Sequence, residues 1–567
     1  MLTTFTAPAF AGTWYIEDGD ITISAGESGN NVTQNENTTK NDTDTIITNR
    51  EEGASSNTVT IEAKDKDDKV EVTLKDLNID ASRGSEAAVS VTGKGDTTIE
   101  LDGDNELQGG DKHAGLEHNQ TVDSEGNVTS GKLTIQDDND NAGSLTATGG
   151  YFGAGIGGGS AKAGQVTITG GTITAISGDG AGIGGGQGNM GSNAGNADIE
   201  ISGGTIEATG GYTSAGIGGG YYGDATIKIT GDAVIKNAAG GFFGAGIGGG
   251  GGGNGDITIS GNAKIENAQG GYAGSGIGGG YGASGTVAIK DDSTVTATGG
   301  EVGAGIGGGV GGLADITIEG NATVNATGGV GSAGIGGGYD AEDDDDGTGN
   351  KITIKSNESG APTVNATGGE SSIDKKTGEK IPGGAGIGSG VGDAKANITL
   401  EGKVTIVAKA GESNAAIGDM NGEQVFTGLD GSITRYDSEG NDTTLPTDPG
   451  YPVPADTSSS GGSSADASVQ ESVFPGLIVT DKDGQRISYT SIRGNNVLSL
   501  RVGRFTASLH ASLSTLRQLR AEGIDTITFQ TILCSTTLSV DELLAMGGED
   551  TEAVLTHRLT ASSLTVG

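Results

Sequence analysis

Ten tyrosine and phenylalanine residues sit at equivalent turns of a repeated segment, and these side chains are suited to binding sugars. The segment GAGIGGG recurs with small variations around Ile156, Ile183, Ile217, Ile247, Ile277, Ile306 and Ile335, and degenerate copies hold Ile387 and Ile417. Before the segment lie Tyr151, Phe152, Tyr212, Phe242, Phe243 and Tyr272, and after it lie Tyr221, Tyr222, Tyr281 and Tyr339. Sugar rings stack on aromatic faces, and exposed apolar patches often mark binding sites. The pattern predicts a long glycan lying along one face. The alternative is that the aromatic rings only cover glycine turns.

Two acidic loops are candidates for calcium. One loop holds Asp340, Glu342, Asp343, Asp344, Asp345 and Asp346, and the other holds Asp137, Asp138 and Asp140. Calcium takes six to eight oxygen ligands, but neither loop has the spacing of an EF-hand. A solvated acidic loop is the alternative in both places.

Enzymatic chemistry has little support in the sequence. A polysaccharide lyase needs a strong cation, yet no arginine lies between Arg83 and Arg435, and the only histidines of the repeat region are His113 and His118. Paired carboxylates could hydrolyse a glycosidic bond, and acidic residues are abundant. We expect no enzymatic activity, with a pectin-type lyase or hydrolase as the alternative.

The spacing of the repeat predicts the fold that positions these residues. Successive central isoleucines are 27, 34, 30, 30, 29 and 29 residues apart, and each repeat holds three short extended pieces with one apolar face. This pattern predicts an all-β, right-handed parallel β-helix with about one repeat per coil. A propeller blade usually needs about 40–45 residues and four strands, so it fits less well. Ala245 and Ile247 should point inward, which would leave a flat outward strip of bare glycine backbone between the aromatic turns. An extra residue at Asn237 and Asn267 predicts a bulge or an inward asparagine.

Composition divides the chain into four parts. Residues 1–11 end in Ala9-Phe10-Ala11 and look like the remnant of a signal peptide. Residues 12–440 form the helix with its N-terminal cap, 441–468 form a Pro/Gly/Ser-rich linker, and 469–567 form a small α/β or α+β domain. In that domain we expect a helical stripe of Leu509, Leu513, Leu516 and Leu519, a strand at 524–530 and a helix near 540–546.

Charge limits the partners. The 74 acidic and 32 basic residues give a formal net charge of -42, which argues against nucleic acid. There is no apolar run of about 18 residues, so we expect no membrane insertion. We expect a monomer whose partner is a polysaccharide.

Four segments carry a resemblance to a known family. They read KVEVTLKDLNID, VSVTGKGDTTIELDGDNEL, GKLTIQ and GSLTATGG, and they resemble the carbohydrate-binding β-helix proteins of anaerobic, cellulose- and pectin-degrading bacteria. The resemblance covers roughly residues 60–440. It implies an extracellular or cell-surface protein that binds acidic plant polysaccharide such as polygalacturonate, with calcium. The GAGIGGG segment departs from the family's usual coil, so no individual ligand residue is transferred. A surface adhesin or inert spacer is the alternative function.

Overall fold

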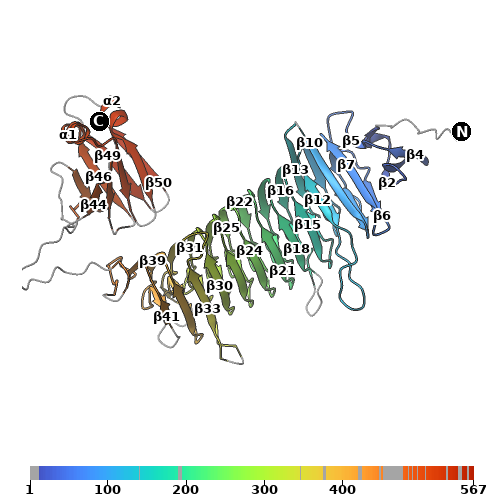
Figure 1. Cartoon of the computed structure of the whole chain (residues 1–567). Helices are drawn as coiled ribbons and strands as arrows, with labels where there is room; N and C mark the ends of the chain where they lie inside the picture. The colour runs from blue at the N-terminus through green and yellow to red at the C-terminus, as the bar shows by residue number, and fades with distance from the viewer. Residues whose placement is uncertain are drawn as a thin grey trace, which may run out of the picture. The chain divides into compact units, whose positions relative to one another are not determined.

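The computed structural model is dominated by a parallel β-solenoid of short strands stacked coil upon coil (Figure 1). It describes residues 12–139, 141–188, 195–344, 347–373, 378–418, 424–445 and 448–450, and within 477–566 all but 483, 488, 494, 495, 503, 505, 532, 533, 547–551, 559 and 560. The expected signal remnant at 1–11 lies outside this range. The predicted fold class is confirmed, and the right-handed sense of the coil stays a prediction.

Sheet 1 forms the first face of the solenoid and contains the GAGIGGG segments. Its order is β4 (Asn37–Asp42), β3 (Asn30–Gln34), β2 (Ile21–Ala25), β6 (Val59–Ala63), β9 (Val89–Gly93), β11 (Leu116–His118), β14 (Ile156–Gly157), β17 (Ile183–Gly184), β20 (Ile217–Gly218), β23 (Ile247–Gly248), β26 (Ile277–Gly278), β29 (Ile306–Gly307), β32 (Ile335–Gly336), β37 (Ile387–Gly388) and β40 (Ile417–Gly418). From β2 onward the strands pair in parallel, whereas β3 and β4 add antiparallel at the N-terminal end. This hairpin covers the first coil, as the predicted cap requires.

Sheets 2 and 3 form the other two faces and are joined by the long strand β10 (Asp96–Gln108). Besides β10, sheet 2 holds β1 (Thr13–Tyr15), β5 (Ile46–Thr48), β7 (Lys69–Lys75), β12 (Leu133–Gln136), β15 (Gly164–Ile168), β18 (Ala197–Ile201), β21 (Ala225–Ile229), β24 (Gly255–Ile259), β27 (Gly285–Ile289), β30 (Ala314–Glu319), β33 (Asn350–Lys355), β38 (Ala396–Glu401) and β41 (Gln424–Thr427). Sheet 3 holds β8 (Asn78–Asp80), β13 (Gly143–Thr148), β16 (Thr172–Ile176), β19 (Thr205–Thr209), β22 (Val234–Ala239), β25 (Lys264–Gln269), β28 (Thr294–Thr298), β31 (Thr323–Thr327), β34 (Thr363–Thr367), β39 (Thr405–Lys409) and β42 (Ser432–Tyr436). A hairpin, β35 (Ser372–Ile373) and β36 (Lys380–Ile381), leaves one turn, and a short 3-10 helix spans Ile16–Asp18.

Alternation of apolar and polar residues builds the core, as the sequence predicts. Ile257 pairs in register with Ile227 and Val287, and all three are buried, while the outward neighbour Asp256 pairs with Thr226 and Thr286. Each fully buried aliphatic side chain contributes about 1.5–3 kcal/mol. No coil buries its own apolar face, so the stack as a whole provides the stability.

The GAGIGGG segment differs from the predicted flat strip. Residues 244–250 are all buried, so its glycines present no exposed floor. The segment folds back on itself, because the amide of Ala245 donates to the carbonyl of Gly249 at 3.0 Å. Gly248 has a φ of +139°, and a Cβ there would lie 1.9 Å from the carbonyl oxygen of Gly278 in the next coil. The glycines therefore serve close packing of backbone on backbone, which the inward and outward alternation of a straight strand misses.

Two strands of sheet 3, β22 and β25, each contain one extra residue, at Asn237 and Asn267. The register shifts where β22 pairs with β19 and where β25 pairs with β28, so the predicted bulge is confirmed. The two asparagines are half-buried rather than inward, and the Asn267 Nδ2 donates to the Asn237 Oδ1 at 2.8 Å.

A buried ion pair occupies the last coil. Arg435 in β42 is the register partner of Ala408, so it takes the inward position that alanine fills in the preceding coils. Its guanidinium donates to both carboxylate oxygens of Asp448, at 2.7 and 3.0 Å, and to the carbonyl of Ile417 at 3.4 Å. Residues 448–450, expected within the linker, thus pack on the solenoid.

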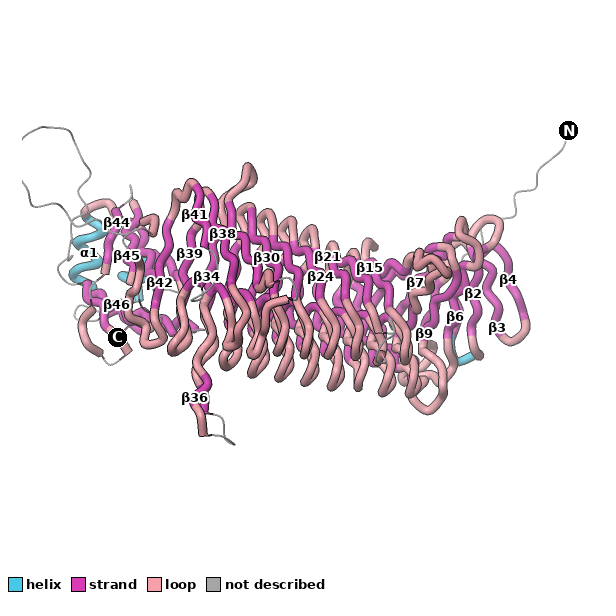
Figure 2. Tube along the Cα trace, turned by 90° about the horizontal axis from the view of Figure 1, so that it is seen from below, coloured by secondary structure: helices cyan, strands magenta, loops and turns pink. Residues whose placement is uncertain are grey.

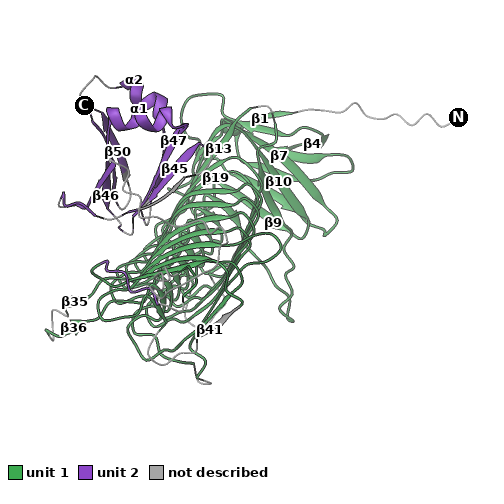
Figure 3. Cartoon of the chain, turned by 60° about the vertical axis from the view of Figure 1, so that its left-hand side comes forward, with its two compact units in different colours: residues 1–439, 447–451 green, residues 440–446, 452–567 purple. Residues whose placement is uncertain are grey.

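The chain divides into two compact units, residues 1–439 with 447–451, and 440–446 with 452–567 (Figure 3). The second unit holds one sheet of β43 (Leu477–Thr480), β46 (Ala507–Ser512), β49 (Glu552–Arg558) and β50 (Ala561–Val566), and another of β44 (Thr490–Arg493), β45 (Val497–Arg501), β47 (Thr526–Gln530) and β48 (Ser535–Ser539).

Two helices, α1 (Leu513–Ala521) and α2 (Val540–Met546), complete this unit. The expected helical stripe is wrong at its start, because Leu509 lies in β46 and the helix begins only after Ser512. The Ser512 hydroxyl accepts from the amide of Thr515 as its N-cap. Of the helices that the structure describes, neither is long and apolar enough to span a bilayer.

Candidate functional site: an aromatic cluster on the turns of sheet 1

The turns before and after each GAGIGGG segment meet on one edge of the solenoid. We call them the leading and trailing turns. The trailing amide of Tyr281 donates to the leading carbonyl of Phe243 in the preceding coil at 2.8 Å, and Gly251 bonds to Thr213 in the same way. The folded-back segment brings its two ends together, so the aromatic residues gather on a ridge instead of bordering a strip. Figure 2 shows the row of loops that these turns form along the solenoid.

Five of the ten predicted aromatic residues form one connected cluster over three coils. This aromatic cluster consists of Tyr212, Phe242, Phe243, Tyr272 and Tyr281. Within it, the rings of Tyr212, Phe242 and Tyr272 form a ring ladder, with centroids 5.3 and 4.7 Å apart and planes within 17° and 5°. The strand spacing of about 4.8 Å brings equivalent rings of successive coils to stacking distance.

Phe243 packs beside the ladder and links it to the trailing Tyr281. The ring of Phe243 lies edge-on to Tyr212 and Phe242, at 5.7 and 4.9 Å, and contacts Tyr281 at 5.3 Å. Tyr212, Tyr272 and Tyr281 are 56%, 42% and 50% exposed, whereas Phe243 is half-buried. The cluster therefore has a half-buried base at Phe243 and three exposed tyrosines around it.

Tyr221 and Tyr222 form a separate pair in the trailing turn after Ile217, and the ring of Tyr221 lies close to Phe243 across Gly251. Their hydroxyl oxygens are 3.1 Å apart, and this hydrogen bond raises the pKa of Tyr221. In the next coil the same two positions are Gly251 and Gly252, and a Cβ on Gly252 would lie 2.5 Å from the ring of Tyr222. The absence of side chains at Gly251 and Gly252 thus leaves room for the rings of Tyr221 and Tyr222 in the preceding coil.

The remaining aromatic candidates lie elsewhere. Tyr151 and Phe152 contact each other edge-on at 4.8 Å, two coils before Tyr212. Tyr339 is half-buried beside Gly331, near Val391 and Ile381. The structure thus shortens the predicted face to a patch of three coils.

Asp179 ends the ring ladder on the Tyr212 side. It lies in the preceding leading turn, where the amide of Tyr212 donates to the carbonyl of Gly178 at 3.3 Å. Burial raises the pKa of this carboxyl, and its Oδ2 accepts from the Gln187 Nε2 at 3.0 Å. The turn beside Tyr212 therefore holds a buried carboxyl that already has a protein partner.

In the described part of the longer acidic loop, two carboxylates are hydrogen-bonded to other residues of the protein. Asp343 accepts from the amide of Lys395 at 2.8 Å and lies 3.0 Å from its Nζ, contacts that lower the pKa of Asp343. Asp344 accepts from the Thr348 hydroxyl at 3.3 Å, while Asp340 and Glu342 are exposed. Asp345 and Asp346 lie outside the described residues.

The shorter acidic loop is organised by Glu100. Its Oε1 accepts from the amides of Asp138 and Asn139 at 3.0 and 3.2 Å. A hydrogen bond to the carboxylate of Glu100, and then its negative charge, raise the pKa of Asp138. Asp137 is half-buried, and Asp140 lies outside the described residues. Across the described chain, no three His, Cys, Asp or Glu side chains converge as a metal site would require.

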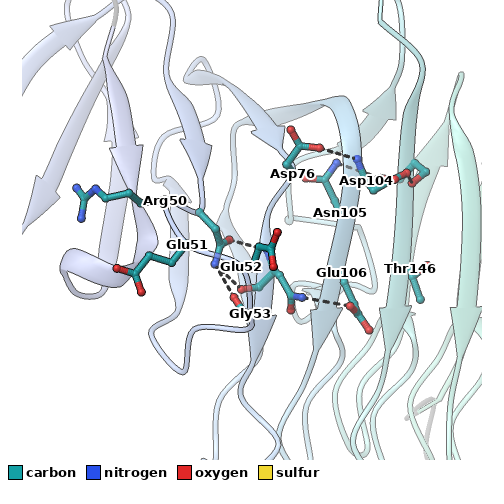
Figure 4. A pocket seen from close by; sticks show the side chains of 12 residues that line it. Arg50, Glu51, Glu52, Gly53, Asp76, Asp104, Asn105, Glu106 and Thr146 are labelled. Carbon is teal, nitrogen blue, oxygen red and sulfur yellow. Dashed lines mark hydrogen bonds between the residues drawn. The ribbon is translucent and has the colours of Figure 1, made fainter.

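A polar cavity that sequence reasoning missed lies at the N-terminal end of sheet 3 (Figure 4). It measures about 700 Å³, and the loop 49–53 overhangs the outward residues of β10 and β13 to form it. Its carboxylates include Asp76, which accepts from the amide of Asp104, and Glu106, which accepts from the Asn78 side chain at 3.2 Å. No sequence pattern indicated that this loop would fold over the sheet. The lining residues Asp76 and Glu106 are thus already hydrogen-bonded to residues of neighbouring coils.

The two histidines of the solenoid have structural partners. His118 is buried, and its ring nitrogens lie 3.2 and 2.9 Å from the carbonyl oxygens of Val91 and Gly131. Burial lowers the pKa of His118, against the effect of these two carbonyls. His113 lies 2.8 Å from the carboxylate of Glu117.

Comparison with known proteins supports the repeat and the fold. Five segments, residues 141–160, 166–187, 199–221, 287–310 and 316–339, match a family model described as a beta helix repeat. No curated protein and no solved structure matches the chain. The comparisons therefore establish a β-helix repeat and leave the ligand open.

Proposed function

We propose that this protein binds a polysaccharide outside the cell, and that the aromatic cluster is its binding surface. The observation that carries the proposal is the ring ladder of Tyr212, Phe242 and Tyr272, which is exposed although aromatic residues make up only 4% of the chain. Large aromatic side chains are mostly buried in folded proteins, and an exposed group of them often marks a binding site.

The geometry favours a short contact over a long one. Within the ladder each inner ring face is covered by its neighbour, so a sugar can reach only the ring edges, the tyrosine hydroxyls and the faces at the ends. The cluster spans three coils, or roughly 10–15 Å at the spacing of parallel strands. We therefore propose that a few sugar units of a longer chain make the contact.

A glycan array tests this proposal. The wild-type chain should bind a defined set of glycans, and the triple variant Tyr212→Ala, Tyr272→Ala, Tyr281→Ala should lose binding to that set. Tyr151→Ala is the matched control, because Tyr151 is 58% exposed at an equivalent turn but lies outside the cluster. Equal binding by the wild type and the triple variant would refute the proposed surface.

Calcium is a separate question that the same assay answers. The aromatic cluster contains no carboxylate, so we expect the glycan binding to persist in EDTA. Loss of binding in EDTA would favour the calcium-assisted binding of acidic polysaccharide that the family resemblance implies. An inert spacer, the competing function, would bind nothing on the array.

A further inference from the structure

The ring ladder meets a different side chain at the Tyr272 end. The amide of Val302 donates to the carbonyl of Tyr272 at 3.0 Å, which places the next leading turn beside Tyr272. At the ladder position of that turn the chain has Glu301 instead of a ring. The face of the Tyr272 ring that points away from Phe242 thus has no aromatic neighbour in the following coil.

Glu301 differs from Asp179, the carboxylate in the turn beside Tyr212. Asp179 is 8% exposed and hydrogen-bonded to Gln187, whereas Glu301 is exposed. Among the described residues, the carboxylate of Glu301 has no hydrogen bond or ion pair. It is therefore available to accept hydrogen bonds from a ligand stacked on Tyr272, and bonds to a charged acceptor are stronger than neutral ones.

No lysine or arginine lies in the leading and trailing turns of the coils that hold Tyr212, Phe242, Tyr272 and Glu301. Between residues 195 and 301 the basic residues are Lys228, Lys236, Lys264 and Lys290. All four lie on sheets 2 and 3 or directly after a strand there, and each is paired with a glutamate. The first basic residues beyond Glu301 along these turns are in the insertion before β37, two coils further on, where Lys380 is paired with Glu412. An anionic sugar on Tyr272 would therefore meet the carboxylate of Glu301 with no cation in the adjoining turns to offset the repulsion.

We propose that Tyr272 and Glu301 form the subsite that sets ligand class, and that it accepts an uncharged sugar with free hydroxyl groups and rejects uronic acids. The sugar ring continues the ladder on the face of Tyr272, and Glu301 accepts hydrogen bonds from its hydroxyls. This inference rests on the proposed function and specifies the substrate class of the same site.

Affinity electrophoresis of the full chain tests the subsite. Gels containing xyloglucan or galactomannan serve as neutral probes, and polygalacturonate serves as the acidic probe. We expect retention on a neutral gel and none on polygalacturonate. Glu301→Gln should weaken neutral retention about tenfold, the usual difference between a charged and a neutral acceptor. Glu301→Lys should gain retention on polygalacturonate.

Glu370→Gln is the matched control. Glu370 is also exposed and follows a Gly-Gly pair at the equivalent position two coils further on. In the coil before Glu370 this position holds Val330, whereas in the coil before Glu301 it holds the aromatic Tyr272. We expect this variant to behave as the wild type. Retention of the wild type on polygalacturonate, or an identical effect of Glu301→Gln and Glu370→Gln, would overturn the subsite while leaving glycan binding intact. Failure to bind either the neutral or the acidic probes, together with an empty glycan array, would overturn the proposed function itself.

Discussion

Removing the guanidinium of Arg435 should unravel the C-terminal end of the solenoid. The side chains of Arg435 and Asp448 are 8% and 1% exposed, so Arg435→Ala leaves a carboxylate buried without its cation. Removing one partner of a buried ion pair costs about 3–5 kcal/mol. The substitution also removes the donor to the carbonyl of Ile417.

The size of the effect can be read from local hydrogen exchange. Each coil contacts mainly its neighbours, so the loss should be confined to the last coils. A cost of about 3–5 kcal/mol corresponds to exchange faster by about a hundred- to a few-thousandfold in β39 and β42, with β24 unchanged.

A double variant separates the ion pair from simple packing. Replacing both partners, as Arg435→Met with Asp448→Leu, removes the charges together and should restore most of the protection, because apolar replacement of a whole buried pair is often neutral or stabilising. Unchanged exchange in Arg435→Ala, or exchange raised equally in β24, would refute a capping role for this pair.

Three further results are expected. Gly248→Ala should destabilise the fold by more than about 4 kcal/mol and sharply reduce the folded yield, because its Cβ would lie 1.9 Å from the carbonyl oxygen of Gly278. Gly282→Ala is the control and should cost about 1 kcal/mol, because Gly282 has a φ of +70° but nothing within 4 Å of an added Cβ. Similar folded yields of the two variants would contradict the packing role of Gly248. Burial lowers the pKa of His118, so protection of β9 and β11 should be full above the ordinary pKa of about 6.5 and fall as the pH drops below it. His118→Gln should remove that pH dependence of the protection factors, and wild-type protection factors that do not change with pH would contradict the assignment. EDTA should leave glycan retention unchanged, and release of the glycan would favour calcium-assisted binding.

Much of the fold could be predicted from the sequence because it depends on repetition. Alternating Ile and Val at a period near 30 specify both the inward faces and the stacking of coils, and the bulge at Asn237 and Asn267 followed from one extra residue. The path of GAGIGGG could not be predicted by alternation. Positive φ at Gly248 turns the chain back, and alternation holds only for extended backbone.

The site could be predicted in its residues but not in its shape. The recurrence of Tyr212, Phe242 and Tyr272 indicated that they share an edge, and they do. Their stacking on one another, and the meeting of leading and trailing turns, depend on the folded-back segment. The sequence marks Arg435 only as a rare arginine, because its partner Asp448 lies in a stretch that reads as linker. The cavity under loop 49–53 depends on tertiary contacts with no local pattern.

Hydroxyl-radical footprinting with the best glycan from the array would test the central claim most directly. The radicals modify exposed aromatic rings, so Tyr212, Tyr272 and Tyr281 should all react in the free protein. On saturation with the glycan we predict protection of these three tyrosines, with Tyr151 modified as before. Binding that leaves the three tyrosines as reactive as in the free protein would contradict the account.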